Sequence, residues 1–270
     1  MSTNYAELAA YTLRSLRERK PLILSLTNNV VQNITANMLL ATGAVPVMLT
    51  HPDEIRDLLH SCANGMLVNL GTLSEAQAAT MRQAVTDAAQ AGVPWVLDPV
   101  AVGLLKFRTQ FCEQLLATPP AMIRGNASEI IALAGEQGAL CRGVESAAES
   151  EAAIAAAQSL ARLTGAAVLV TGETDYATDG TTTVACSNGH PLMTRVTGVG
   201  CAMGALCAAC LAVADTPLHA AVACAAILGL AGEKAAANAP HPGTFAAKLL
   251  DELDVLNSEN VFEEAQLEEI

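Results

Sequence analysis

The segment from Thr197 to Gly204 has the composition of an anion-binding loop that leads into a helix. Gly198 and Gly200 permit a tight turn, and unpaired N–H groups at the start of the following helix attract a phosphate, together with the helix dipole. This helix is predicted over residues 202–214, a run of small residues. The spacing fits neither a P-loop nor a dinucleotide-binding fingerprint. Spacing alone also leaves open a tight turn into a buried helix.

Cys201 is the residue of this loop whose side chain could take part in chemistry. A thiol at a helix N-terminus is expected to have a lowered pKa, so Cys201 could serve as a weak base or as a hydrogen-bond donor. The alternative is a small apolar residue in a helix that is rich in Ala and Cys. A C-x-x-C pair in the same helix, Cys207 and Cys210, has no second Cys or His pair nearby, which favours packing over zinc binding or redox work.

A second candidate group is the pair Asn126 and Glu129, which are three residues apart on the predicted first turn of a helix. Both side chains can therefore face one point beyond the end of the preceding strand. A carboxylate there can hold the water ligands of Mg²⁺, because this ion keeps much of its hydration in proteins. The alternative is a capping box with Asn126 as N-cap and Glu129 at N3, and both roles are compatible.

Two further charged residues directly end short apolar runs, Asp98 before a proline and Arg124 before a glycine. Asp98 could add negative charge near a metal ion, or it could simply start an Asp-Pro turn. A cation at the end of an apolar strand is out of place unless it reaches an anion or a carboxylate, so Arg124 contacts either a bound anion or a structural salt-bridge partner.

These residues require a sheet that brings the ends of several strands together. Short apolar runs alternate with helical patterns, which is typical of βαβ units and a mainly parallel sheet with helices on both faces. The runs are residues 22–26, 44–48, 66–70, 95–97, 122–124 and 166–170. Ligands of such sheets bind beyond the carboxyl ends of the strands, where the candidate residues lie.

The ends of the helices carry recognisable capping signals. Asn28 or Asn29 is predicted to cap a helix that ends at Thr42, Ser74 a helix that ends near Gly92, and Asn126 a helix over 127–134. Asp179-Gly180 and Asn188-Gly189 are hairpin signals, so residues 176–196 are predicted to form an antiparallel meander at one edge of the sheet.

Five motifs along the chain resemble those of hydroxyethylthiazole kinases, a branch of the ribokinase-like kinases, and they occur in the family's order. They are T-N-N-V-V, G-A-x-P-V-M, D-P-V, R-G-N-A-S-E and T-G-x-G-C. The resemblance runs from about Leu22 to the helices after the anion loop. It implies a ribokinase-like α/β fold and transfer of phosphate from ATP to the hydroxyl of 4-methyl-5-(2-hydroxyethyl)thiazole, in thiamine biosynthesis or salvage.

The resemblance also implies roles for individual residues. Most ribokinase-like kinases have a catalytic aspartate where this chain has Cys201, and the cysteine is typical of the thiazole kinases. The thiazole is expected to contact Met48, Gly198 and Asn28. ATP is expected to contact Arg124, Thr171, Asn126 and Gly200. Mg²⁺ is expected near Glu129 and Asp98. Family members are trimers with the substrate site at the subunit interface, so a homotrimer is expected.

Composition limits the remaining possibilities. The chain has 270 residues, 52% hydrophobic, and no linker-like segment, so one domain over 1–270 is expected. A net charge of −13 argues against nucleic acid or an anionic membrane as a partner. The apolar segment 218–232 is shorter than a membrane span and reads as half of a buried helical hairpin. Without an export signal, the eight cysteines indicate a reducing, cytoplasmic location.

Two other functions are compatible with these motifs. One is a different ribokinase-like enzyme, acting on hydroxymethylpyrimidine, pyridoxal or a nicotinamide hydrate, although most of these carry Asp at the position of Cys201. The other is a non-catalytic, nucleotide-binding oligomer. The presence of Asn126, Glu129 and the glycine loop favours the kinase.

Overall fold

The computed structural model describes residues 3–135 and 146–270, without the side chains of 146–149. In this part of the chain nine strands form one sheet, in the order β2-β1-β3-β4-β5-β6-β7-β8-β9. The strands are β1 (Leu22–Leu26), β2 (Val45–Val47), β3 (Gly65–Asn69), β4 (Trp95–Asp98), β5 (Met122–Asn126), β6 (Ala167–Thr171), β7 (Asp175–Thr178), β8 (Thr183–Cys186) and β9 (Leu267–Glu269). Strands β1 to β6 are parallel to one another, as predicted, and β7 to β9 continue the sheet in antiparallel fashion.

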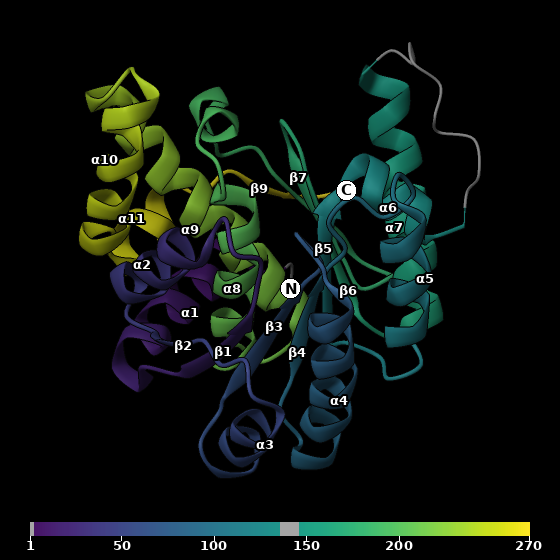
Figure 1. Cartoon of the computed structure of the whole chain (residues 1–270). Helices are drawn as coiled ribbons and strands as arrows, with labels where there is room; N and C mark the ends of the chain where they lie inside the picture. The colour runs from purple at the N-terminus through teal and green to yellow at the C-terminus, as the bar shows by residue number, and fades with distance from the viewer. Residues whose placement is uncertain (1–2, 136–145) are drawn as a thin grey trace.

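Helices cover both faces of the sheet, and each face has its own apolar core. The first group is α1 (Tyr5–Arg19), α2 (Gln32–Thr42), α8 (Val199–Leu211), α9 (Pro217–Asn238), α10 (Pro242–Val255) and α11 (Ser258–Glu264). The second group is α3 (Pro52–Ser61), α4 (Glu75–Ala91), α5 (Lys106–Leu115), α6 (Ala127–Leu133) and α7 (Ser146–Thr164). Figure 1 shows the first group on the left of the sheet, α4 to α7 on the right and α3 at the bottom. The predicted α/β architecture is therefore confirmed.

The capping predictions hold for two of the three helices. Ser74 and Asn126 each form a complete capping box at the start of α4 and α6. The prediction for α2 is wrong, because its N-cap is Val31 and no side chain caps it. Asn28 lies too early to reach that helix, and its Oδ1 accepts a hydrogen bond from the Val30 N–H instead.

The predicted meander is correct only in its first half. Asp179-Gly180 does join β7 to β8, but Asn188-Gly189 leads into a short 3₁₀ helix, η1 (Pro191–Arg195), and not into a third strand. Pro191 has no N–H to donate to a strand ladder, and the buried Asn188 side chain bonds to α9 and to the backbone of Gln266. The outer strand of this edge is β9, from the C-terminus.

Helices α8 and α9 form the predicted buried helical hairpin. Helix α9 has 22 residues and is long and apolar enough to cross a membrane. The segment 218–232 that was predicted from the sequence is therefore shorter than the helix itself. However, 78% of its most apolar 18-residue stretch is buried inside the protein, as expected for a core helix. The cysteines of the described segments are all free, and Cys207 and Cys210 are buried among apolar side chains; the eighth, Cys141, lies outside the described residues.

Candidate functional site

The glycine loop joins directly onto α8, which begins at Val199, three residues earlier than predicted. Gly200 and Cys201 are therefore part of the first helical turn. The first backbone N–H bonded within the helix is that of Ala202, so the three N–H groups before it have no helical partner, and no side chain caps them. Such a helix start suits an anion.

Gly198 fixes where this helix start lies. Its φ is 95°, and a Cβ there would come within 2.8 Å of Ile34 and 2.9 Å of Val31, on the other side of the contact with α2. Only glycine combines this backbone conformation with so close an approach. The loop is consequently held against α2, at the carboxyl end of β1.

The Arg124 side chain lies directly beneath the first turn of α8. Its Nη2 donates a 2.8 Å hydrogen bond to Thr171 Oγ1, and a Cβ at Gly200 would be 3.2 Å from the same nitrogen. Its Nη1 is 3.9 Å from Asp98 Oδ1, in a side chain only 11% exposed. A nearly buried guanidinium thus faces the unpaired N–H groups at the start of α8. A polyanion bound between them would neutralise the charge of Arg124 and accept hydrogen bonds from these N–H groups.

A cavity of about 760 Å³ opens beside this arginine. All four residues predicted to contact ATP line it: Arg124, Asn126, Thr171 and Gly200. Its far wall is formed by residues from the β6–β7 loop, the β8–η1 segment, α8 and α9, namely Asp175, Asn188, Met193, Met203, Leu228 and their neighbours. Among the described lining residues, Arg124 is the only Lys or Arg. The cavity therefore combines the Arg124 guanidinium at one end with both apolar and polar side chains along the far wall, which suits a nucleotide.

Comparison with known proteins identifies the family. The sequence model of the hydroxyethylthiazole kinase family matches residues 13–259. A hydroxyethylthiazole kinase from Akkermansia muciniphila is 53% identical over 265 residues, which cover 98% of this chain and 97% of that protein. The chain belongs to the hydroxyethylthiazole kinase family.

Solved structures agree with this assignment. A hydroxyethylthiazole kinase from Pyrococcus horikoshii superposes with a TM-score of 0.90 at 38% identity, covering 98% of this chain and 99% of that one. A ribokinase-like protein from Enterococcus faecalis has a TM-score of 0.63 at 13% identity, covering 95% and 96% of the two chains, which shows a shared fold alone. The predicted ribokinase-like fold and the kinase class are both confirmed.

The environment of Cys201 differs from the one predicted for this member of the hydroxyethylthiazole kinase family. Burial raises the pKa of the Cys201 thiol, and the negative charge of Asp98 raises it further. Hydrogen bonds from the Asn69 and Asn28 side chains and the charge of Arg124 oppose this shift but do not cancel it. The expectation of a lowered pKa was therefore wrong, because desolvation outweighs the helix N-terminus here.

Asp98 is fully buried at the end of β4 in this kinase. Asn69 Nδ2 donates a 2.6 Å hydrogen bond to Asp98 Oδ2, whereas Asp98 Oδ1 has no hydrogen-bond partner among the described residues. Burial raises the pKa of Asp98 to about 7, although Arg124 and the Asn69 hydrogen bond act in the opposite direction. The carboxyl group is thus available for an additional partner.

Glu129 forms the predicted capping box, and it also makes a contact that the sequence did not indicate. Its Oε2 accepts from the Asn126 N–H at 3.0 Å, and its Oε1 accepts from the Ala101 N–H at 2.9 Å. The carboxylate therefore joins the start of α6 to the turn after Asp98. Among the described residues, no group of three or more His, Cys, Asp and Glu side chains could hold a metal by itself.

The residues predicted to contact the thiazole lie outside the cavity lining. Asn28 and Gly198 lie at the carboxyl end of β1 and the start of α8, and Asn28 Nδ2 is 3.6 Å from Cys201 Sγ. Met48 follows the edge strand β2 and is half-buried. Asn28 and Cys201 are thus in contact, and Met48 follows the strand β2, which pairs with β1. The substrate roles stay predictions.

Three polar residues near the cavity were missed from the sequence. Asn69, at the end of β3, follows the same rule that singled out Asp98 and Arg124, but it is hidden within an apolar run. Asn188 was interpreted only as a turn residue. Asp175 lines the cavity from the start of β7; burial raises its pKa to about 6 against the hydrogen bond from the Gly172 N–H.

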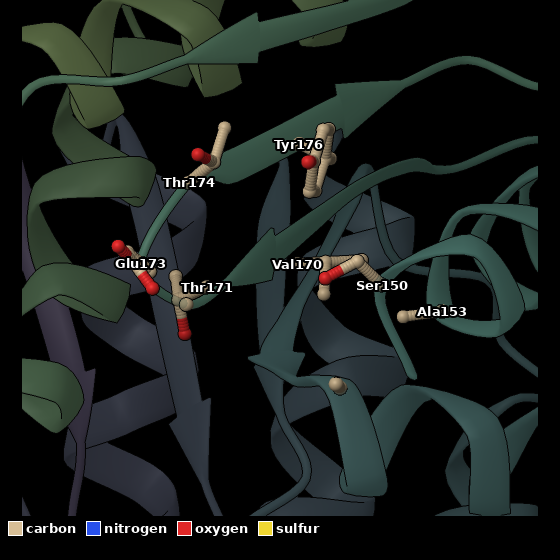
Figure 2. Close-up of a pocket in the computed structure, with 9 residues that line it drawn as sticks. Ser150, Ala153, Val170, Thr171, Glu173, Thr174 and Tyr176 are labelled. Carbon is tan, nitrogen blue, oxygen red and sulfur yellow. The ribbon is translucent and has the colours of Figure 1, made fainter. Parts of the chain in front are cut away.

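A smaller hollow of about 200 Å³ lies on the other side of the β6–β7 loop. Figure 2 shows Ser150 and Ala153 of α7 on one side of it and Thr171, Glu173 and Thr174 on the other, with Tyr176 above. Its described lining carries the Glu173 carboxylate and no Lys or Arg. The larger cavity, which contains Arg124, is therefore the better site for phosphates.

The raised pKa of Asp98 predicts a pH-dependent stability. Between pH 4 and pH 7 the folded protein binds a proton at Asp98 that the unfolded chain does not, so the free energy of unfolding falls as pH rises through this range. Replacing Asp98 by Asn removes the contribution of Asp98, whereas that of Asp175, whose pKa burial also raises, is common to both proteins. In metal-free buffer, we compare the free energy of unfolding of Asp98→Asn with that of the parent. We expect this difference to shift in favour of the variant by on the order of 4 kcal/mol when the pH is raised from 4 to 8. Denaturant unfolding at pH 4 and pH 8 measures the free energy of unfolding of both proteins. An equal change in this free energy between the two pH values for parent and variant would contradict the raised pKa of Asp98.

Proposed function

We propose that residues 1–270 form a single kinase domain that transfers the γ-phosphoryl group of ATP to the hydroxyl of 4-methyl-5-(2-hydroxyethyl)thiazole, in thiamine biosynthesis or salvage. One observation carries the proposal. The buried Arg124 guanidinium, the unpaired N–H groups at the start of α8 and a cavity of nucleotide size meet at one point, in a member of the hydroxyethylthiazole kinase family.

The chain's own groups account for the main demands of phosphoryl transfer, which are positioning and charge stabilisation. The N–H groups of Val199, Gly200 and Cys201 would bind the γ-phosphate. The Arg124 side chain, held by its bond to Thr171, would neutralise charge at the neighbouring phosphates. These donors are fixed before the nucleotide binds, so they need not reorganise during the reaction.

The residues near this point also fit a hydrated Mg²⁺. The unpartnered, buried Oδ1 of Asp98 and the partly engaged carboxylate of Glu129 are oxygen donors of the kind that Mg²⁺ prefers. Because two carboxylates cannot complete an octahedral shell, phosphates and water would supply the remaining ligands. If bound there, the ion would offset the negative charge of the phosphates.

The thiazole alcohol would bind on the opposite side of the α8 N-terminus, near Asn28, Gly198 and Cys201, with Met48 as an apolar contact. A neutral, polarisable ring suits thioether and backbone groups better than charged side chains. The apolar side chains of Val30, Leu40 and Val45 are exposed nearby, along α2 and the edge strand β2. They support the proposal that the protein is a homotrimer whose substrate site lies at the subunit interface, and we place this trimer in the cytoplasm.

The function is tested by an ATP/Mg²⁺ phosphorylation assay across a panel of vitamin-precursor alcohols. We expect the thiazole alcohol to have the highest kcat/KM, at least tenfold above hydroxymethylpyrimidine and pyridoxal. A different preferred alcohol would replace the proposed substrate. ATP binding without turnover of any alcohol would favour the non-catalytic oligomer. Light scattering of the purified protein measures the trimer.

Cys201 provides a further test, because its raised pKa makes the thiol a poor base at neutral pH. We expect Cys201→Ala to bind ATP normally and to lose about tenfold in kcat, less than the hundredfold or more that a general base supplies. Cys201→Asp should remain an active kinase, since a carboxylate restores the common base of the superfamily. A loss well above a hundredfold in Cys201→Ala, with ATP binding intact, would instead identify the thiol as the base.

A further inference from the structure

Four polar residues stand side by side across the sheet, on the face covered by α8. Asn69 pairs with Asp98 between β3 and β4. Continuing the pairing of β1 with β3 and of β4 with β5 by one residue places Thr27 beside Asn69 and Arg124 beside Asp98. Side chains of paired residues point to the same face, so this row lies directly under the first turns of α8. Asp98 and Arg124 are proposed reaction groups, and Asn69 stands next to Asp98 in the row.

Both the oxygen and the nitrogen of the Asn69 amide are hydrogen-bonded. Its Oδ1 accepts from Asn28 Nδ2 at 2.9 Å and from the Gly71 N–H at 3.0 Å, and its Nδ2 donates to Asp98 Oδ2 at 2.6 Å. The side chain is completely buried. A flipped amide would place its NH₂ group against two other donors, so only one orientation satisfies the network.

This orientation determines that of Asn28 in turn. The Asn28 amide must direct its Nδ2 toward Asn69, and the same nitrogen lies 3.6 Å from Cys201 Sγ. Its Oδ1 accepts from the Val30 N–H, which leaves the side chain no alternative position. Gly71 provides the room for this arrangement, since a Cβ there would be 2.5 Å from Asn28 Nδ2.

We propose that Asn69 is a positioning residue for phosphoryl transfer, which holds the Asp98 carboxyl group and, both directly and through Asn28, the Cys201 thiol in one fixed arrangement under the start of α8. This inference rests on the proposed function. Asn69 touches neither substrate, and it acts by fixing groups on both sides of the reaction centre. Loss of such a fixed arrangement lowers turnover more than it lowers binding.

The test compares Asn69→Asp with the parent. Aspartate has the same shape and retains the acceptor for Asn28 and Gly71, but it presents an acceptor where Asp98 needs a donor. We expect kcat for the thiazole alcohol to fall at least tenfold, while the ATP dissociation constant changes less than threefold. Alkylation of Cys201 by iodoacetamide at pH 8, located by peptide mass spectrometry, should slow at least threefold. The variant loses the hydrogen bond from the Asn69 amide to the sulfur and gains a negative charge beside it, and both changes disfavour the reactive thiolate.

Asn64→Asp is the matched control. Asn64 immediately precedes the other end of β3, and its Oδ1 accepts from the Leu22 N–H, a bond that aspartate preserves. This variant should match the parent in both measurements. If Asn69→Asp does not fold, Asn69→Leu, with the same number of side-chain atoms, is expected to give the same pair of changes.

The proposal requires both effects in a folded Asn69 variant. A kcat within threefold of the parent would overturn it, as would a loss of kcat without any change in the alkylation of Cys201. If the panel assay identifies another alcohol, the proposed substrate is wrong, and the same comparison with that alcohol still decides the role of Asn69. If no alcohol is phosphorylated, the positioning role falls with the kinase activity, even where the alkylation rate responds.

Discussion

Replacing Arg124 by Ala is expected to weaken ATP binding about a hundredfold, with little change in binding of the thiazole alcohol. Arg124 is the only Lys or Arg among the described residues that line the nucleotide cavity. Without it, the carboxyl groups of Asp98 and Asp175 would face the triphosphate with no nearby cation. A buried, charge-assisted contact to phosphate is worth about 2 to 3 kcal/mol, which corresponds to a hundredfold loss. Calorimetry with a non-hydrolysable ATP analogue and, separately, with the alcohol measures the two affinities.

Two further variants separate the charge of Arg124 from its position. Arg124→Lys retains the charge but not the planar donor pair, so it should recover only part of the affinity. Thr171→Val removes the 2.8 Å hydrogen bond while leaving the guanidinium in place, and it should cost less than tenfold. Equal losses for both ligands in Arg124→Ala, or a collapsed fold, would indicate a structural ion pair with Asp98.

The parts of the site that follow strands within a few residues can be predicted from the sequence. The apolar runs predict six parallel strands, and all six are present with ends shifted by at most two residues. The carboxyl ends of parallel strands lie on the same side of a sheet, so Asp98, Arg124 and Thr171 are expected to lie near one another. In the structure Arg124 contacts both Asp98 and Thr171. The sequence is enough to predict these positions because each residue directly ends a strand that the sequence itself predicts.

The remaining features depend on contacts between distant segments. The apolar wall of the cavity combines residues around Met193 with Leu228 of α9, and no local pattern connects them. The role of Asn188 depends on Glu233 and on the C-terminal Gln266, so an Asn-Gly pair that usually marks a hairpin does not form one. The pKa of Cys201 depends on burial, which the position at a helix start cannot reveal.

Glu129 combines a structural and a proposed metal-binding role, which Glu129→Gln can separate. Glutamine keeps one acceptor oxygen, but its NH₂ group must face one of the two backbone N–H groups that the carboxylate now binds. We therefore expect a stability loss of about 1 kcal/mol, the usual value of a lost cap. Turnover should fall about a hundredfold or more, and the Mg²⁺ concentration for half-maximal rate should rise, because the charge that holds the hydrated ion is lost.

The capping box of α4 provides the control for this prediction. Gln77 occupies the same N3 position there, with Ser74 as its partner, and it lies outside the cavity lining. Gln77→Ala should lower stability by a similar amount and leave turnover and its Mg²⁺ dependence unchanged. If Glu129→Gln behaves like Gln77→Ala at limiting Mg²⁺, the carboxylate of Glu129 acts only as a cap. In that case Asp98, with its unpartnered Oδ1, would be the remaining protein group suited to the ion.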